Sequence, residues 1–332
     1  MNRRPFLALL PAATGALVLL TLLAIFAGRY PVGFSDLTAR FTGGSDDPMA
    51  QTVLFDFRLP RILLALTCGM AMALSGAVLQ TLTRNPLAAP GLVGVEAGAS
   101  ITVLSAMVLW PGALAVGLYP LAAFVGAIAV AGTIAGLAWR HGVSALRLLL
   151  VGVGITALLA AFSDLLITYG RIERVESALL WLAGSLHRAD WPQVQSQVLW
   201  LALAGFPILV LWRHFDLFQL GDSLAASRGL DTVRFQILAL FLSVMLTASA
   251  VANVGIMSFI GLLAPHLARQ FAGARHRLYL PLSALMGGMI VLAADTIGRS
   301  AFAPLQIPAG LVVAIIGAPY LLFLLSRKGA RA

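Results

Sequence analysis

Three carboxylates lie within or next to long apolar runs of the sequence: Glu96, Asp164 and Asp295. A carboxylate in hydrocarbon is costly, and those found in membrane segments commonly serve protons, ions or polar substrates. Asp295 precedes Arg299 by four residues, so on a helix the two side chains share a face and neutralise each other. Asp164 lies near the end of its run. Glu96 then either lines a substrate path or bonds to a neighbouring helix, which is thin support for a proton-driven carrier.

The sequence lacks the common motifs for nucleotide hydrolysis and metal catalysis. It has no GxxxxGK[ST] segment and no HExxH segment, and its one lysine is Lys328. GVGITA at 152–157 mimics a dinucleotide fingerprint, but no strand precedes it, and such glycines favour close helix packing instead. The single cysteine, Cys68, is expected to be a small buried hydrophobe. We expect no catalytic residue, metal site or cofactor in this chain, so transport energy would come from a partner or an ion gradient.

The composition of the chain indicates the environment in which these carboxylates lie. The 332 residues are 60% hydrophobic and 11% charged, and the mean hydropathy is +0.95. Apolar runs long enough to cross a hydrocarbon core of about 30 Å recur along the chain. The sequence therefore predicts an all-α polytopic membrane protein with about ten transmembrane helices. These are expected at residues 6–28, 61–82, 92–109, 114–138, 145–168, 193–212, 236–254, 256–267, 278–297 and 306–325.

The charges set the expected orientation. With the N-terminus in the cytosol, the cytosolic connections hold more arginine than the outer ones, as the positive-inside rule requires. Topology thus explains most of the net charge of +9, and no nucleic-acid partner is needed. The first run resembles a signal peptide but is too long for one, so we interpret it as a retained helix. We expect one transmembrane domain over residues 1–332, both termini in the cytosol and a bacterial inner membrane around it.

Two outer excursions are sizeable, at about 29–61 and 169–192. The second holds an amphipathic stretch with Trp181 and Trp191, which predicts a segment lying along the membrane interface.

The turn RNPLAAPGLVGVEAGAS (84–100) places a charge, an amide and two prolines between two apolar runs. Pro86 and Pro90 end helices and fix a rigid elbow. Asn85 can satisfy backbone groups that the elbow frees. On its own the turn could be an ordinary tight connection.

The stretch RLPRILLALTCGMAMALSGAVLQTLTRNPLAAPGLVGVEAGA (58–99), however, closely resembles the second helix, turn and third helix of FecCD-type permeases. These are the membrane subunits of ABC importers for iron–siderophores, haem and vitamin B12. The resemblance covers nearly the whole chain in order. It continues through WLAGSL (181–186), LGDSLAASRGLD (220–231), GIMSFIGLLAPHLAR (255–269), LAADTIGR (292–299) and QIPAGLVVAIIGAPYLLFLL (306–325).

The resemblance implies the type II ABC importer permease fold, with ten spans and both ends in the cytosol. It implies that two separate ATPase subunits hold ATP and Mg²⁺ and drive this chain. A second permease chain, identical or homologous, would complete the pathway, and a periplasmic or lipid-anchored binding protein would deliver the substrate. An iron–siderophore complex is the expected cargo, with haem or vitamin B12 as alternatives. A secondary transporter driven by an ion gradient is the distant alternative.

The resemblance also implies three sets of site residues. The first is a short cytosolic helix, in a loop at about 213–235, that seats in a groove of the ATPase. Its residues are Gly221, Asp222, Ser223, Ala225, Ala226, Gly229 and Leu230. Asp222 near its start and Gly229 near its end suggest a capped helix.

The second set docks the binding protein through Arg58, Arg61 and Arg299, because the planar guanidinium binds carboxylates bidentately. The alternative is local neutralisation, such as Arg299 with Asp295 or Arg58 with Asp56. The third set forms the gate and translocation path. It comprises Asn85, Pro86, Leu87, Glu96 and Gly154.

One departure from the family pattern concerns the substrate. Many members carry an acidic residue before the IP or LP of the last helix, where this chain has Gln306. The surrounding segment looks more like hydroxamate-siderophore permeases than like the vitamin B12 permease. Since selectivity rests mainly with the binding protein, the substrate is expected to be poorly encoded in this chain.

Overall fold

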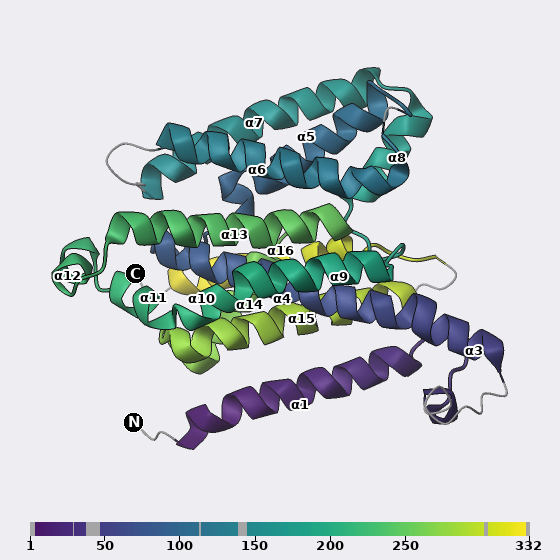
Figure 1. Ribbon diagram of the computed structural model, residues 1–332, viewed down its shortest axis with the longest axis horizontal. Coiled ribbons are helices and arrows are strands. Elements are labelled where there is room, and N and C mark those ends of the chain that lie inside the picture. Colours follow the sequence, from purple (N-terminus) through teal and green to yellow (C-terminus); the bar gives the residue numbers. More distant parts are fainter. Residues whose placement is uncertain are drawn as a thin grey trace.

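The computed structural model describes residues 4–28, 30–37, 47–112, 114–138, 145–301 and 305–329. This part of the chain is built from helices joined by turns, with no strand among the described residues. In Figure 1 most helices run along the long axis of the molecule, with α1 (Arg4–Phe26) at one edge and α7 (Ala145–Tyr169) at the other. We name the two ends of this bundle after α12 (Asp222–Ser227) and α3 (Pro48–Thr52), which lie at opposite ends.

Each predicted span coincides with a helix or a continuous helical run. Besides α1 and α7, the helices at these spans are α4 (Leu59–Leu82), α5 (Val95–Val108), α6 (Tyr119–Ala138), α9 (Trp191–Trp200) with η4 (Leu201–Gly205) and α10 (Phe206–Val210), α13 (Thr232–Val254), α14 (Ile260–Ala272), α15 (His276–Ser300) and α16 (Ala309–Gly329). Within the described ranges, seven runs are long and apolar enough to cross a membrane. The helices α5 and α14 are shorter, as is the apolar part of α16, Ala309–Phe323.

The second span starts earlier than predicted. A helical run of 35 residues, Pro48–Leu82, includes α3, a π-helical turn at Val53–Arg58 and α4. The Asp47 side chain caps its start by accepting bonds from the Met49 and Ala50 N–H groups, with Pro48 following the cap. Hydrogen bonds from the Tyr30 hydroxyl and these N–H groups lower the pKa of Asp47. Part of the expected outer loop is therefore a capped helix start.

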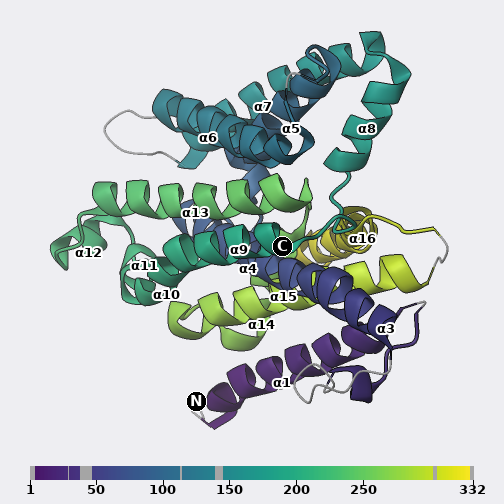
Figure 2. The same ribbon diagram turned by 45° about the vertical axis from the view of Figure 1, so that its right-hand side comes forward.

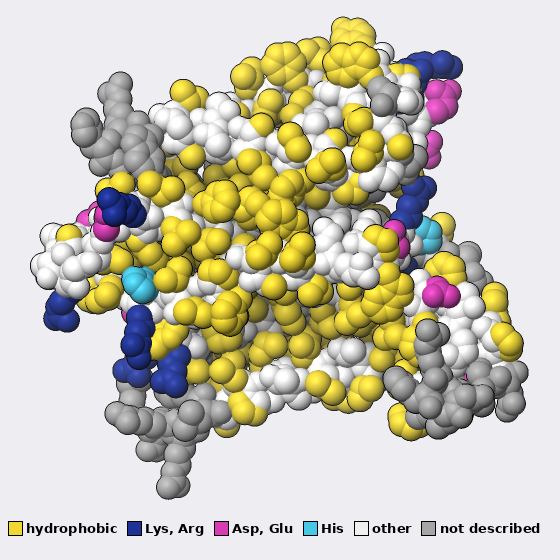
Figure 3. Space-filling view, viewed as in Figure 1, with side chains coloured by type: hydrophobic (Ala, Val, Ile, Leu, Met, Phe, Trp, Pro, Cys, Tyr) yellow, Lys and Arg dark blue, Asp and Glu magenta, His cyan; other side chains and the backbone are white. Residues whose placement is uncertain are grey.

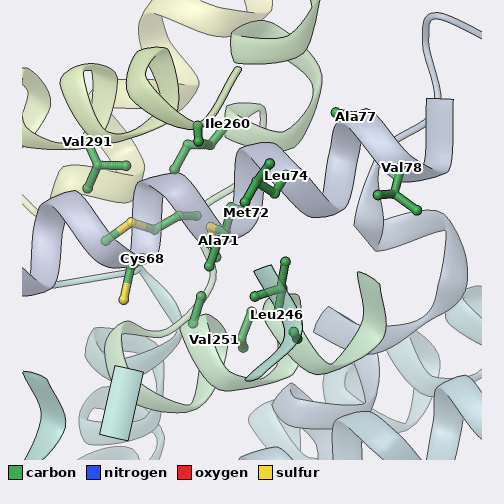
Figure 4. Packing of buried hydrophobic residues seen from close by; sticks show 14 of the residues in the cluster. Cys68, Ala71, Met72, Leu74, Ala77, Val78, Leu246, Val251, Ile260 and Val291 are labelled. Carbon is green, nitrogen blue, oxygen red and sulfur yellow. The ribbon is translucent and has the colours of Figure 1, made fainter. Parts of the chain in front are cut away.

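The helix α4 forms the centre of the packing. It contacts α13, α14 and α15, and 18 of its 24 residues are buried. Figure 4 shows Cys68, Met72 and Leu74 of α4 among residues of α13, α14 and α15. Cys68 is fully buried and unpaired, as expected of a small hydrophobe.

Glycines allow these helices to approach at the level of the backbone. A Cβ on Gly76 would collide with the Gly261 carbonyl of α14, and one on Gly69 would collide with the Gly287 carbonyl of α15. In a membrane, helix association depends on such close packing because lipid tails are as apolar as leucine.

The surface matches a membrane environment. Figure 3 shows a broad hydrophobic face along the bundle, with charged side chains gathered at its two ends. The helix α7 is the least buried of the long spans. The amphipathic α8 (Ile172–Leu182) lies at the α3 end, at a steep angle to the other helices (Figure 2). The predicted interfacial stretch is divided between two helices, because Trp181 lies in α8 whereas Trp191 starts α9 (Trp191–Trp200), which belongs to a candidate membrane span. The apolar helices make the chain a multi-pass membrane protein.

The crossing of α4 and α14 gives the first prediction. Replacing Gly76 by leucine should destabilise the fold by about 1–3 kcal/mol or more, since overpacking forces the backbones apart. The fraction of monodisperse protein after heating in detergent measures this effect. The matched control is Gly132→Leu in α6, where nothing lies within 4 Å of a Cβ. Equal heat resistance of both variants would contradict the packing assignment.

Candidate functional site

At the α3 end, Arg61 and Asp295 form a bidentate ion pair between α4 and α15. The Arg61 Nε lies 3.0 Å from both carboxylate oxygens of Asp295, and its Nη2 lies 2.8 Å from Oδ1. Asp295 is only 1% exposed. Arg299, one turn further along α15, holds its Nε 3.7 Å from Oδ2. The predicted neutralisation of Asp295 by Arg299 is thus present, but Arg61 is the stronger partner.

Two arginines cap the end of α1. Arg58 donates to the carbonyls of Ile25 at 2.7 Å and Tyr30 at 2.5 Å. Arg299 donates to those of Ala27 at 2.8 Å and Ala24 at 2.5 Å. The last carbonyls of a helix have no partner within the helix and carry partial negative charge. The two guanidinium groups therefore anchor α1 to α4 and α15.

These contacts bear on the predicted docking role. The structure brings Arg58, Arg61 and Arg299 to the same end of the bundle, but most of their donors bond within the chain. Arg58 is 6% exposed, and its guanidinium donates to two backbone carbonyls instead of pairing with Asp56. The Arg61 side chain is 14% exposed. Contact with an acidic partner stays a prediction for this set, and Arg61 is the best placed to make it.

Two further side chains extend the cluster to the surface. The Gln306 Oε1 lies 3.0 Å from Arg61 Nη1 and 2.8 Å from His187 Nδ1. Both Gln306 and His187 are exposed. Gln306 stood out in the sequence as a departure from the family pattern. His187 did not, because nothing in WLAGSL (181–186) indicates that the following residue contacts Gln306, more than a hundred positions later.

At the opposite end, α12 is a short helix closed as its sequence suggests. Gly229 adopts a left-handed φ of +84°. The Gly229 N–H bonds to the Ala226 carbonyl and the Leu230 N–H to the Ala225 carbonyl, which is the Schellman pattern. The start differs from the expectation. Gly221 occupies the N-cap position, and no side chain caps the helix, because the Asp222 carboxylate bonds elsewhere.

The predicted coupling residues divide into two faces. Ala225 and Leu230 are buried and hold α12 against the bundle. Asp222, Ser223, Ala226 and Gly229 are exposed, and Gly221 is half-buried. The segment thus presents a small-residue surface at the tip of the bundle (Figure 1).

The turn after α4 is also a Schellman motif. The Asn85 N–H bonds to the Gln80 carbonyl at 3.1 Å, and the Arg84 N–H bonds to the Thr81 carbonyl at 3.2 Å. The Asn85 side chain accepts from the Leu87 N–H at 2.9 Å, which confirms its predicted role in satisfying the elbow. Pro90 then starts a 3-10 turn, Pro90–Val93, that leads into α5.

Arg84 links this turn to the end of α11 (Trp212–Phe218) and the start of α12. Its Nη2 lies 2.6 Å from Asp222 Oδ1 and 3.3 Å from the Phe218 carbonyl oxygen. Its guanidinium carbon lies 5.0 Å from the centre of the Phe218 ring. Sequence reasoning noted Arg84 only as a charge in the turn. The sequence did hold one sign of its role. An arginine stands directly after the helix C-cap, a position where glycine is usual.

A hydrogen-bonded chain centred on the buried His276 also connects α4, α11 and α15. Asp216 of α11 accepts from the His276 N–H at 2.9 Å, and its Oδ1 lies 2.7 Å from His276 Nδ1. The His276 Nε2 in turn lies 2.9 Å from the Thr81 hydroxyl of α4. His276 is fully buried. None of these three residues stood out in the sequence, because Thr81 is one of many residues of its motif and Asp216 and His276 lie outside the motifs.

The predicted gate residues do not converge within this chain. Asn85, Pro86 and Leu87 form the elbow, and Glu96 begins α5 with its carboxylate against Gly91. Gly154 lies on an exposed face of α7, with nothing within 4 Å of a Cβ there. Its neighbour Gly152 does pack closely, against the Leu92 carbonyl. Among the described residues, no group of three or more His, Cys, Asp or Glu side chains is placed to hold a metal ion.

Comparison with known proteins gives the family. A model of the FecCD transport family matches residues 16–327. The Fe(3+) dicitrate transport system permease protein FecD of Escherichia coli K12 is 39% identical over 321 residues, which cover 97% of this chain and 99% of the relative. The iron(3+)-hydroxamate import system permease protein FhuG of Bacillus subtilis is 37% identical over 286 residues, 83% of this chain and 84% of the relative.

A third relative and a solved structure widen the comparison. The cobalamin import system permease protein BtuC of Halobacterium salinarum is 37% identical over 284 residues, 85% of this chain and 76% of the relative. An inward-facing structure of a metal-chelate type ABC transporter superposes with a TM-score of 0.86 at 29% identity, covering 96% of this chain and 98% of that one. The chain belongs to the FecCD transport family, and its fold is that of type II ABC importer permeases.

The buried ion pair yields a second prediction. Asp295→Asn should cost about 3–5 kcal/mol, because it leaves Arg61 and Arg299 buried without their shared counter-charge. Heating in detergent followed by size-exclusion chromatography measures the loss. Glu173→Gln is the control, since it breaks the exposed Arg171–Glu173 pair and should cost about 0–1 kcal/mol. A similar loss in both would show that burial of the Asp295 pair is energetically unimportant.

Proposed function

We propose that this chain is the permease subunit of an ABC importer that moves an iron–siderophore complex across the bacterial inner membrane. The observation that carries the proposal is the family match along residues 16–327, in the same fold and over nearly the whole chain. Relatives named for ferric citrate and ferric hydroxamate uptake support an iron complex as cargo. The cobalamin relative supports vitamin B12 as the second candidate. Haem is the third, on the family resemblance alone.

The energy for transport comes from two ATPase subunits, which hold ATP and Mg²⁺. This chain itself binds no cofactor and catalyses no reaction. Its exposed α12 residues contact the ATPase. The buried Ala225 and Leu230 transmit the displacement of α12 to the bundle. A second permease chain, a copy or a homologue, packs against this one, with membrane lipid around both. The α12 end, including both termini, lies in the cytosol.

A periplasmic or lipid-anchored substrate-binding protein docks at the α3 end. Arg61 is the docking residue that this structure favours, because its Nη1 reaches the exposed Gln306. Arg58 and Arg299 support the surface by fixing the end of α1 beneath it.

Reconstituted uptake tests the function. With the partner ATPase and binding protein in proteoliposomes, a ferric siderophore should accumulate only when ATP is supplied to the ATPase side. An ATPase variant unable to hydrolyse ATP should abolish the uptake, and a proton or sodium gradient alone should not drive it. Parallel assays with cobalamin and haemin identify the cargo. Uphill uptake by this chain without the ATPase would refute the proposal.

Docking has a separate test in a paired comparison. Arg61→Gln should weaken binding of the substrate-binding protein about tenfold or more, because charge pairs at interfaces couple by about 1.5 kcal/mol and upward. Arg171→Gln removes an exposed arginine charge at the start of α8 that is not predicted to dock, and it should leave that affinity unchanged. Binding is measured on immobilised proteoliposomes. If both variants bind alike, Arg61 does not provide the docking charge.

A further inference from the structure

The backbone at Arg84 adopts a conformation that side chains disfavour. Its φ is +50°, and within the described ranges Phe259 is the other non-glycine residue with positive φ. Arg84 occupies the position after the α4 C-cap, where helices usually place glycine. A side chain there costs about 1 kcal/mol. Such strain persists when the surrounding structure holds the residue in place, and it directs attention to what the side chain does.

The Arg84 side chain lies at the corner between α11 and α12. Phe218 is the last residue of α11 and Asp222 is the first of α12. One guanidinium nitrogen contacts both the Phe218 carbonyl and the Asp222 carboxylate. The guanidinium carbon lies over the Phe218 ring, in a cation–π contact. A single side chain from the turn after α4 therefore contacts both α11 and α12 at their junction.

Stability does not account for this arrangement. The Arg84 and Asp222 side chains are 44% and 60% exposed, and ion pairs of that kind contribute about 0–1 kcal/mol. That gain and the cation–π contact with Phe218, about 0.5–1 kcal/mol at an exposed site, are together close to the cost of the left-handed backbone. The contacts of Arg84 therefore add little to the net free energy of folding, and their clearest effect is to fix the turn relative to the junction of α11 and α12.

The two elements that Arg84 joins are otherwise separate in sequence by more than a hundred residues. On one side is the corner preceding the exposed α12 surface. On the other is the rigid elbow formed by Asn85, Pro86 and Leu87, which follows Arg84 directly. A displacement of α12 has a short route to this elbow through the guanidinium, because Arg84 and Asn85 are neighbours in the chain.

We propose that Arg84 is a positioning residue that transmits movement of α12 to the elbow at 85–87 and so couples ATP hydrolysis to the opening of the pathway. The proposal rests on the importer function argued above and names a residue that acts at its coupling step. Arg84 touches neither the substrate nor the ATPase in this role. It acts through Asp222 and the Phe218 carbonyl.

The decisive variant is Arg84→Gly. Glycine accepts the left-handed φ, so the fold should keep its heat resistance or gain slightly, while the link to α12 is lost. Uptake per ATP hydrolysed, in proteoliposomes with the ATPase, binding protein and a ferric siderophore, should fall at least about fivefold, the lower range of typical coupling between sites. Hydrolysis itself should continue. A structural role alone would instead predict lower heat resistance.

A charge swap tests the same link independently of backbone strain. Asp222→Asn should lower the coupling ratio as Arg84→Gly does. The double variant Arg84→Asp with Asp222→Arg should recover much of it, since aspartate tolerates the left-handed region. Recovery in the swap shows that the pair matters rather than either side chain alone.

The matched control is the Asp231–Arg234 pair at the same end of the bundle, 3.1 Å apart and within the first turn of α13. Arg234→Ala breaks an exposed ion pair of the same type that joins no separate elements, and it should leave the coupling ratio unchanged. Normal coupling in Arg84→Gly, or an equal loss in Arg234→Ala, would overturn the proposal. Absence of ATP-driven uptake in the unaltered transporter would instead refute the importer function, so the two failures are distinguishable.

Discussion

The close approach of α4 to its neighbours is the constraint on which both ends of this protein depend. Gly76 lies against the Gly261 backbone of α14, and Gly69 lies against Gly287 of α15. At these points the helices touch through main-chain atoms, so they can neither slide nor separate without steric collision or a void. Because packed interiors are dense and resist deformation, a displacement at one end of α4 is carried as a movement of the whole helix.

The polar contacts follow from the position of α4 at the centre. Buried polar groups near the ends of α4 have no water to bond to, so they bond within the protein, and the exposed Arg84 beyond its end adds a further contact. Arg58 and Arg61 at the start of α4 bond to the end of α1 and to Asp295. Thr81 and Arg84 at its end bond to His276 and Asp222. One helix thus connects the surface proposed for the binding protein with the surface proposed for the ATPase.

Patterns that depend on neighbouring residues were predictable from the sequence. Apolar runs located all the long helices, and Gly229 marked the end of α12 because its left-handed turn is a local property. The early start of the second span was missed, since Asp47 and Pro48 form a cap that the loop composition hides. The sequence also did not predict that Arg58 and Arg299 cap the end of α1. This cap joins residues about thirty and more than 270 positions apart, and only the folded arrangement places α1 beside α15.

The same distinction applies to Asp222, for which the sequence predicts a role in capping α12 that the structure does not show. An aspartate at the start of a short helix commonly accepts from the helix N–H groups. Here Gly221 takes the cap position with φ of +104°, and the carboxylate is left to pair with Arg84. No local rule distinguishes these outcomes, because the competing partner comes from a turn 138 residues earlier.

The end of α4 is connected to α11 and α12 by two kinds of contact, one centred on buried groups and one exposed. The Asp216–His276–Thr81 chain reaches its fully buried end at Thr81, where a broken hydrogen bond costs the desolvation of a polar group. The Arg84–Asp222 pair is exposed, so water and ions replace either partner at little cost. The contacts of the buried His276 are therefore the firmer attachment, although the Asp216 side chain is 33% exposed, and the Arg84–Asp222 pair is the looser one. In the coupling proposed above, a segment held firmly at one point and loosely at another would pivot about the firm one. Movement of α12 would then turn about the His276 contacts and reach the elbow at 85–87 through Arg84.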